Sequence, residues 1–239
     1  MKLGTKFALV GATVLLVAPG IASAAVVIVR SAGSAAKSYP PGKALPDNAS
    51  IKLGDGDMVT VLTSNSARVL RGPGVFAVGA DRQSLAMAAG RRARFGALRT
   101  GDVAKNPSLW DVDATQSGKM CVSNPAKLSL WRPNKDEAVK INIRSSNGKT
   151  QSVDWAAGKQ TVGWPQNLPI TSGAEYQIEG LGADTSSVRF VTVKTPPADL
   201  VGAAKVLIDN DCQNQLDLLV ESASKPQSST AAATERGSD

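Results

Sequence analysis

Residues 139–155 read VKINIRSSNGKTQSVDW and carry the clearest hairpin signature in the chain. Apolar and polar residues alternate there, and Asn147-Gly148 stands between the two alternating runs. An Asn-Gly pair flanked by such runs is the strongest short-range hairpin signal, because both residues tolerate the positive backbone angles of a tight turn. The segment therefore predicts two antiparallel strands, over residues 138–144 and 149–155.

Similar short apolar runs continue on both sides of this hairpin. They are separated by turn signals such as Pro165 and Pro169. Regularly spaced short strands with turns between them are typical of an antiparallel sandwich, which we expect over residues 106–195. The further strands are predicted over residues 119–122, 127–132, 159–164, 174–179 and 187–194.

All four tryptophans of the chain fall in this second region. Tryptophan side chains most often pack in a core, and an exposed platform for carbohydrate is the alternative interpretation. We therefore expect core positions for Trp110, Trp131, Trp155 and Trp164.

The region before residue 79 carries its own strand and turn signals. Residues 26–29 form a β-branched run that predicts a buried strand. The fold class expected for the whole chain is mainly β, with two small β-domains, of which the first spans residues 25–78. Two hairpins are predicted in it: strands 51–53 and 58–63 around Gly54-Asp55-Gly56-Asp57, and strands 67–71 and 75–78 around Gly72-Pro73-Gly74.

Residues 1–24 have the three parts of a cleavable secretory signal. Lys2 and Lys6 precede an apolar stretch over 7–21, and the small residues Ala22-Ser23-Ala24 follow it. A retained membrane anchor is the alternative, but the apolar stretch is shorter than the roughly 20 residues that span a bilayer. We expect an exported protein, either periplasmic or secreted.

Residues 79–105 predict a basic linker, in which residues 81–89 have the composition of a short helix. A solvated linker is the plain interpretation, and a contact with an anionic membrane or polysaccharide is the alternative. No aromatic residues interleave with the arginines, so nucleic acid is not an expected partner. The candidate residues for an anionic surface are Arg82, Arg91, Arg92, Arg94 and Arg99.

Apolar residues at helical spacing follow Pro196-Pro197 and predict C-terminal helices over residues 196–222. We expect these helices to cap the sandwich. Residues 223–239 are rich in Ser, Ala and Thr and predict a disordered tail. The two cysteines, Cys121 and Cys212, predict one disulfide in an oxidising compartment, closing a loop of about 90 residues.

The composition excludes several chemistries. The chain contains no histidine, so it has neither a Ser-His-Asp or Cys-His nucleophile nor an imidazole metal ligand. Two distant cysteines supply neither a CxxC redox pair nor a four-cysteine zinc site. Gly54-Asp55-Gly56-Asp57 lacks the spacing of a calcium loop and is interpreted as a turn. We therefore expect no cofactor, no metal and no enzymatic activity.

Paired carboxylates are the remaining catalytic hypothesis, because glycosidase chemistry needs no histidine. Asp111 with Asp113, and Glu175 with Glu179, are spaced so that each pair falls on one side of a strand. Such pairs are common on solvated strand faces, and this is the interpretation that we adopt.

The series LGDGDMVTVL over residues 53–62, followed by ARVLRGPG over 67–74, resembles the extracytoplasmic β-domain of FecR-type regulators and of exported FecR-like proteins. Residues 128–133 (LSLWRP) and 163–165 (GWP) are similar to the immunoglobulin-like modules that accompany such domains. A FecR regulator carries an anti-sigma segment and a membrane helix before its periplasmic part, and we expect this protein to have neither. The resemblance implies a signalling accessory whose partner is a membrane sensor or another envelope protein.

Two functions follow from these observations as hypotheses. The first is a non-enzymatic binding or signalling-accessory protein that acts through protein–protein contacts. The alternative is a structural envelope protein that associates with anionic membrane or polysaccharide. A formal net charge of +7 favours contact with anionic envelope surfaces without selecting between the two hypotheses.

Overall fold

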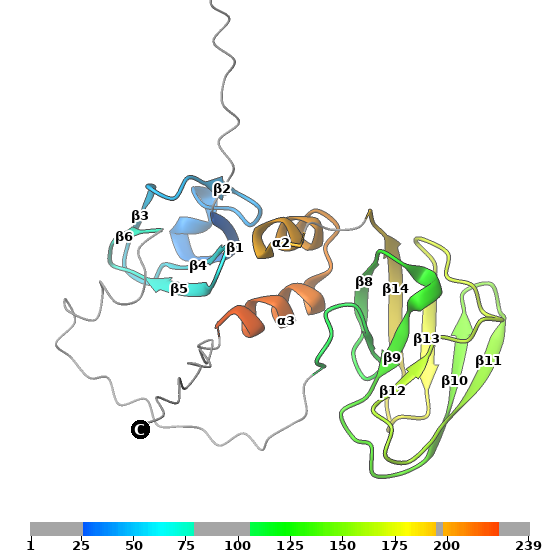
Figure 1. Ribbon diagram of the computed structural model, residues 1–239. Helices are drawn as coiled ribbons and strands as arrows, with labels where there is room; N and C mark the ends of the chain where they lie inside the picture. The colour runs from blue at the N-terminus through cyan, green and yellow to red at the C-terminus, as the bar shows by residue number, and fades with distance from the viewer. Residues whose placement is uncertain (1–25, 79–105, 195–197, 225–239) are drawn as a thin grey trace, which may run out of the picture.

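The computed structural model describes residues 26–78, 106–194 and 198–224. These residues form two β-rich units, one on each side of a pair of helices (Figure 1). The first unit comprises residues 26–78, the second comprises residues 106–194, and the helices come from residues 198–224. The mainly β architecture with two small β-domains and C-terminal helices, which the sequence predicts, is confirmed.

Two small sheets make up the first unit. The larger sheet has the strand order β2-β1-β4-β5 with antiparallel neighbours, and β3 pairs with β6, also antiparallel. A 3-10 helix, η1 (Gly33–Lys37), follows the first strand. The strands are β1 (Val26–Ala32), β2 (Ala44–Leu45), β3 (Ser50–Leu53), β4 (Met58–Thr63), β5 (Ala67–Arg71) and β6 (Gly74–Ala77).

Strand β1 is buried on both of its faces. Val26 and Ile28 belong to the core between the two sheets, where Ile51 of β3 also lies. Val27 and Val29 point the other way and pack in a second core, with the C-terminal helices. Because both faces are covered, the strand needs an unbroken apolar run rather than an alternating one. The buried strand predicted over residues 26–29 is thus confirmed.

The two hairpins predicted for this unit are wrong. Strand β3 pairs with β6, and β4 pairs with β1 and β5. The turn at residues 54–57 therefore carries the chain from the small sheet to the large one, and the turn at 72–73 carries it back. The true hairpin joins β4 to β5, where the Ser66 N–H donates to Oγ1 of Thr63 at 3.0 Å. Alternation identifies a strand, but it does not say whether the next strand lies in the same sheet.

Asp57 holds the turn between the sheets in place. The residue is 5% exposed, and its carboxylate accepts hydrogen bonds from the Ala35 N–H (3.0 Å), the Gly54 N–H (2.8 Å) and the Ser34 hydroxyl (3.0 Å). The Ala35 N–H, followed by that of Gly54, lowers the pKa of Asp57. Gly33 has a φ of +79°, and a Cβ there would collide with this carboxylate. Asp57 therefore fixes η1 against the turn.

Replacing Asp57 with Asn is expected to lower the melting temperature at neutral pH by several degrees, because the amide loses the charge-assisted hydrogen bonds. The pKa of Asp57 is lower in the folded than in the unfolded protein, so its contribution is complete above the unfolded value and is lost as the pH falls through the folded value. The difference between wild type and Asp57→Asn should thus shrink in acid. Thermal melts from neutral to acidic pH measure this difference.

Asp55 offers the control, since it is exposed in the same turn. Asp55→Asn should melt near the wild type throughout the pH series. A difference between wild type and Asp57→Asn that stayed constant down to the lowest pH would contradict the role of the carboxylate.

The second unit is a sandwich of a five-stranded and a three-stranded sheet. The strand orders are β11-β10-β13-β14-β8 and β12-β9-β7. Pairs β14–β8 and β7–β9 are parallel, so the sandwich is not wholly antiparallel as predicted. The strands are β7 (Val112–Asp113), β8 (Gly118–Val122), β9 (Ser129–Trp131), β10 (Val139–Ser145), β11 (Thr150–Trp155), β12 (Thr161–Gly163), β13 (Glu175–Glu179) and β14 (Ser186–Thr192).

The hairpin predicted at Asn147-Gly148 is confirmed. Strands β10 and β11 pair in register from Val139 opposite Trp155 to Arg144 opposite Thr150. Gly148 has a φ of +85°, and its N–H donates to the Ser145 carbonyl at 2.9 Å to close the turn. The left-handed backbone at this position explains why the turn uses glycine.

Aromatic side chains fill the core of the sandwich. Trp131 and Trp155 are each 1% exposed and Trp164 is 5% exposed, so the core interpretation of these three tryptophans is confirmed. Trp164 packs edge-on against Tyr176 and Phe190, with ring centroids 5.3 and 5.1 Å away. Its indole N–H donates to the Leu168 carbonyl at 2.6 Å, which satisfies the polar atom inside the core.

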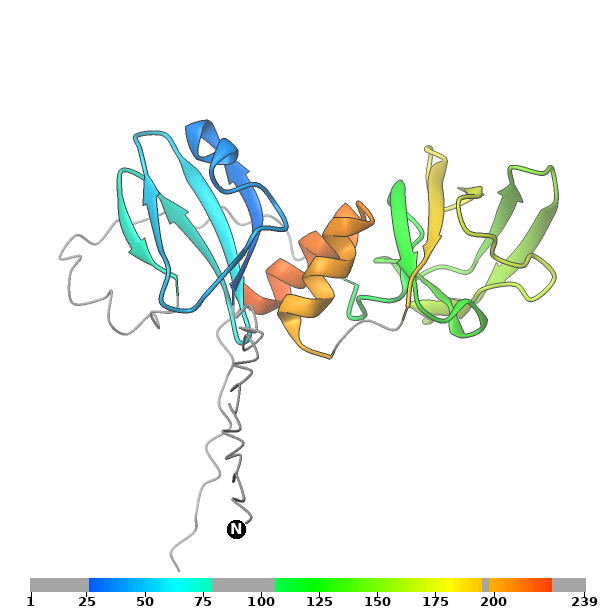
Figure 2. The same cartoon turned by 90° about the horizontal axis from the view of Figure 1, so that it is seen from above.

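The helices lie between the two β-units and do not simply cap the sandwich (Figure 2). α2 (Leu200–Asp209) begins after Asp199, whose carboxylate accepts the Gly202 N–H at 2.7 Å, and α3 (Gln213–Ser224) follows it. Leu207 of α2 and Leu216 of α3 share a core with Val27, Val29 and Leu62 of the first unit. The expectation that the helices cap the sandwich is therefore corrected: their apolar faces cover the large sheet of the first unit.

Several sequence predictions concern residues outside the described ranges. They are the signal at 1–24, the basic linker at 79–105 with its five arginines, and nearly all of the tail at 223–239. Residues 223–224 are described and belong to α3. Within the described ranges, the model contains no helix that is both long enough and apolar enough to span a bilayer.

Candidate functional site

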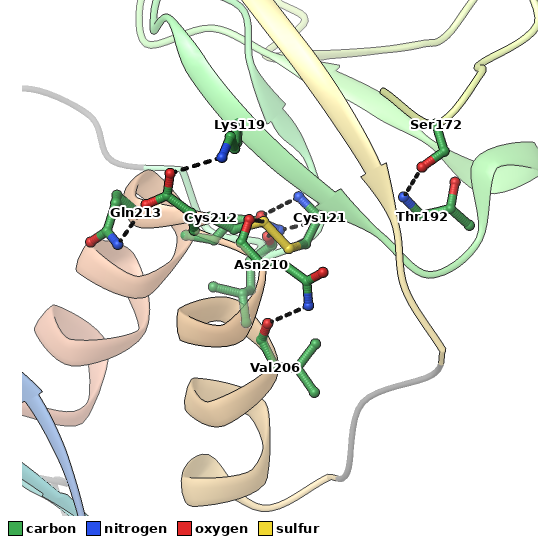
Figure 3. The surroundings of a disulfide bond; sticks show 11 residues. Lys119, Cys121, Ser172, Thr192, Val206, Asn210, Cys212 and Gln213 are labelled. Carbon is green, nitrogen blue, oxygen red and sulfur yellow. Dashed lines mark hydrogen bonds and ion pairs between the residues drawn. A yellow bond between two sulfur atoms is a disulfide. The ribbon is translucent and has the colours of Figure 1, made fainter. Parts of the chain in front are cut away.

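Cys121 and Cys212 form a disulfide between the sandwich and the helices (Figure 3). Cys121 lies on β8, and Cys212 immediately precedes α3. Their Cα atoms are 5.9 Å apart, within the usual range for a disulfide, and both residues are fully buried. The bridge expected from the sequence is present, and it links the sandwich to helices that are packed on the first unit.

A buried glutamine reinforces this junction. Gln215 of α3 is 4% exposed, and its side-chain amide forms two hydrogen bonds with the backbone of Cys121. The Cys121 N–H donates to Oε1 at 2.7 Å, and Nε2 donates to the Cys121 carbonyl at 3.0 Å. Nε2 also donates to the Leu109 carbonyl at 2.9 Å. Because β8 is an edge strand of its sheet, the amide takes the place of the strand that would otherwise pair there.

Polar contacts continue along the exposed part of this junction. Lys119 of β8 forms an ion pair with Asp211 at 2.9 Å, as Figure 3 shows, and Nδ2 of Asn214 donates to the Ser117 carbonyl at 3.0 Å. The hydrogen bond from Lys119 is the main cause that lowers the pKa of Asp211. Farther along α3, Asp217 pairs with Arg30 of β1. The α2–α3 turn and α3 thus make polar contacts with both β-units.

A cleft of about 390 Å³ lies where α3 meets the sandwich. Val112, Met120 and Trp131 from three strands line one side, and Asn214 and Leu218 of α3 line the other. Four carboxylates also line the cleft, whereas Lys119 is the cation among the lining residues. The carboxylates are Asp111, Asp113, Asp217 and Glu221.

The sequence singled out Asp111 and Asp113 as a pair, and both line this cleft. Burial raises the pKa of Asp111. Asp113 accepts hydrogen bonds from the Thr115 hydroxyl at 2.6 Å and from Nε2 of Gln116 at 3.1 Å. The two acids therefore differ in their surroundings. Asp111 is partly desolvated, whereas Asp113 accepts hydrogen bonds from neighbouring side chains.

The other predicted pair lies on a strand face. Glu175 of β13 accepts hydrogen bonds from the Ser187 hydroxyl (2.7 Å) and from Arg189 (3.0 Å), both on β14. These two contacts, with Ser187 first, lower the pKa of Glu175. The carboxylate is thus engaged in a cross-strand ion pair, as the plain interpretation of the pair predicts.

The remaining sequence candidates are a possible metal-binding turn and a group of arginines proposed to contact an anionic surface. The Gly54-Asp55-Gly56-Asp57 segment is a turn, because donors from the protein surround the Asp57 carboxylate. Across residues 26–78, 106–194 and 198–224, no three or more Cys, Asp or Glu side chains gather in a metal-binding group. The five arginines proposed to contact an anionic surface lie outside these ranges.

Sequence reasoning missed Gln215 and the cleft. A glutamine within an amphipathic helical pattern gives no signal that it is buried. The approach of α3 to β8 depends on the disulfide and on the fold of three separate parts of the chain.

Comparison with known proteins found no matching family model, no matching curated protein and no matching solved structure.

Proposed function

We propose that this chain is an exported, non-enzymatic binding protein that serves as a signalling accessory through contacts with another envelope protein. The observation that carries the proposal is the coupling of two β-units through α2, α3 and the Cys121–Cys212 disulfide. Such coupling presents the loops of both units to a partner in a fixed arrangement. A disulfide also favours an oxidising, extracytoplasmic location.

Features of the two units support the same proposal. The hydroxyl of Tyr176, near the start of β13, donates to the Pro169 carbonyl at 2.9 Å and accepts the Thr171 N–H at 3.0 Å. A tyrosine that bonds back to preceding backbone at this place is a hallmark of immunoglobulin-type sandwiches. It agrees with the immunoglobulin-like module that the sequence resembles. Such sandwiches bind partners through loops at their ends.

The first unit offers an apolar contact on its surface. Among the residues that the structure describes, two large apolar side chains are exposed: Val75 of β6, which is 69% exposed, and Val69 of β5, which is 50% exposed. Both strands adjoin the turn at residues 72–73, within the segment that resembles a FecR-type domain. We assign the partner contact to this end of the first unit.

Site-specific photo-crosslinking in cells of the native host tests the proposal. A photoreactive amino acid at position 75 should give a discrete adduct with one envelope protein, identified by mass spectrometry. The matched control is position 149, which is exposed in the β10–β11 turn of the other unit. Adducts with lipid or polysaccharide alone would replace the proposal with a structural envelope role, and equal adducts at both positions would refute the assigned contact.

A further inference from the structure

A second cleft lies in the sandwich, where the loop after β9 meets the loop after β13. Its volume of about 300 Å³ is at the lower end of the range for known ligand pockets, about 300–1,000 Å³. Arg132 and Asn134 line this cleft, and its apolar lining residues include Pro133, Val139 and Leu181. The partner contact proposed above lies in the other β-unit, so a ligand in this cleft is independent of it.

Arg132 is a buried cation without a carboxylate partner. The residue is 3% exposed and forms no ion pair with an acid of the described ranges. Its Nε donates to the Lys159 carbonyl at 3.2 Å, and its Nη2 donates to the carbonyls of Glu137 (2.8 Å) and Ala156 (3.0 Å). The guanidinium also stacks on Trp155, 4.9 Å from the ring centroid. These contacts fix the guanidinium but supply no negative charge to balance it.

Two N–H groups of Arg132 remain without an acceptor. A guanidinium has five N–H donors, and the three carbonyls take the one on Nε and the two on Nη2. In the part of the chain that the structure describes, the buried side-chain polar atoms without a partner belong to Ser31, Trp131 and Trp155. Nη1 of Arg132 is not among them although it donates no hydrogen bond, so it is open to solvent. Because the rest of the side chain is buried, Nη1 opens into the cleft that Arg132 lines.

Asn134 adds a second donor group to the cleft. Its Oδ1 accepts the Asp136 N–H at 2.9 Å, which orients the amide, and its Nδ2 donates to no acceptor within the described ranges. Glu137 also lines the cleft, but it is exposed, and it contacts Arg132 through its backbone carbonyl rather than its carboxylate. The unused donors therefore favour an anion, and the apolar lining favours a ligand that also has a hydrocarbon part.

We propose that this cleft binds a small organic carboxylate that carries an apolar group. One carboxylate oxygen accepts an N–H of Arg132 Nη1, and the other accepts an N–H of Asn134 Nδ2. The apolar group contacts Val139 and Leu181. The ligand thus supplies the counter-ion that the buried guanidinium lacks, and hydrogen bonds between a guanidinium and a carboxylate are among the strongest in proteins.

Titration of the 15N-labelled protein with isobutyrate, followed by NMR, tests this inference. Saturable shifts are expected for the Nε–H of Arg132 and for the backbone amides of residues 134–139 and 180–182. Isobutyramide has the same shape without the charge and should bind about tenfold more weakly, because it forms no charge-assisted hydrogen bond. Inorganic phosphate lacks the apolar group and should also bind more weakly. Tighter binding of phosphate than of isobutyrate would overturn the assignment to a carboxylate.

Asn134→Asp places a negative charge beside the ligand and should weaken isobutyrate binding by about fivefold. Asn147→Asp is the matched control, because Asn147 is also exposed in a loop and its Oδ1 also accepts a backbone N–H, that of Lys149 at 3.1 Å. The same change of charge there should leave binding unchanged.

Arg132→Gln removes the cation and should abolish the saturable shifts. Arg132 also holds three carbonyls, so the NMR spectrum of this variant first reports whether the fold is kept. If the fold is lost, the comparison of Asn134→Asp with Asn147→Asp decides. Equal binding of isobutyrate and isobutyramide, equal binding by the two Asp variants, or the lack of a saturable shift at millimolar concentrations would each overturn the inference.

Discussion

The double variant Cys121→Ala, Cys212→Ala is expected to lose about 4–5 kcal/mol of unfolding free energy, because a cross-link over this span strongly restricts the unfolded chain. The disulfide closes a loop with a sequence separation of 91 residues. Urea unfolding monitored by tryptophan fluorescence measures the loss, since Trp131, Trp155 and Trp164 are buried in the sandwich.

Reduction of the wild type provides the matched control for this variant. Dithiothreitol should lower the unfolding midpoint of the wild type toward that of the double variant, and it should leave the variant unaffected. An unchanged midpoint in both cases would mean that the cross-link does not restrict the unfolded chain as its span implies.

Phe190→Ala is expected to destabilise the sandwich by about 3–5 kcal/mol, the usual cost of removing a buried aromatic ring. Phe190 is fully buried, and its ring lies 5.1 Å from that of Trp164 and 5.2 Å from that of Tyr176. The variant removes both ring contacts and leaves a cavity at the centre of the core. Urea unfolding of the variant, compared with the wild type, gives the value.

Val75→Ala is the control for the effect of shortening an apolar side chain. Because Val75 is 69% exposed, its replacement should change the unfolding free energy by no more than about 0.5 kcal/mol. A Phe190 variant as stable as the Val75 variant would show that the three rings do not form the packed centre of the sandwich.

The strands of the second unit, except β7, were predictable because they are short apolar runs separated by turn signals. The predicted segments 119–122, 149–155 and 174–179 differ by a single residue at one end from β8, β11 and β13. The parallel pairing of β8 with β14 was not predictable, because alternation places a strand without specifying its neighbour.

In the first unit, alternation and turn signals located the strands other than β2, but they predicted the wrong pairs. The glycine-rich turn at residues 54–57 has the composition of a hairpin turn, but Asp57 bonds to Ala35 rather than across a hairpin. That contact joins positions 22 residues apart, so nothing in the local sequence reports it. The burial of β4 on both faces follows from the docking of helices that lie more than a hundred residues later in the chain.

The sequence predicts two of the acidic residues that line the cleft, but it does not predict the cleft. Asp111 and Asp113 were recognised by their spacing, whereas Trp131 was identified only as a core residue. The sequence could not show that α3 would place a helix face beside them and so form a cleft. That arrangement depends on Gln215, whose pairing with Cys121 spans 94 positions.

The hydrogen bonds of Gln215 also affect whether the edge strand β8 can pair with a strand of a second molecule. An edge strand with free N–H and carbonyl groups is a template on which a second molecule can add its own strand, and chains of such additions grow into aggregates. By bonding to both backbone groups of Cys121, Gln215 blocks this template at that residue of β8. The helix thus protects this edge of the sheet from pairing with a second molecule, and the disulfide holds the helix in position.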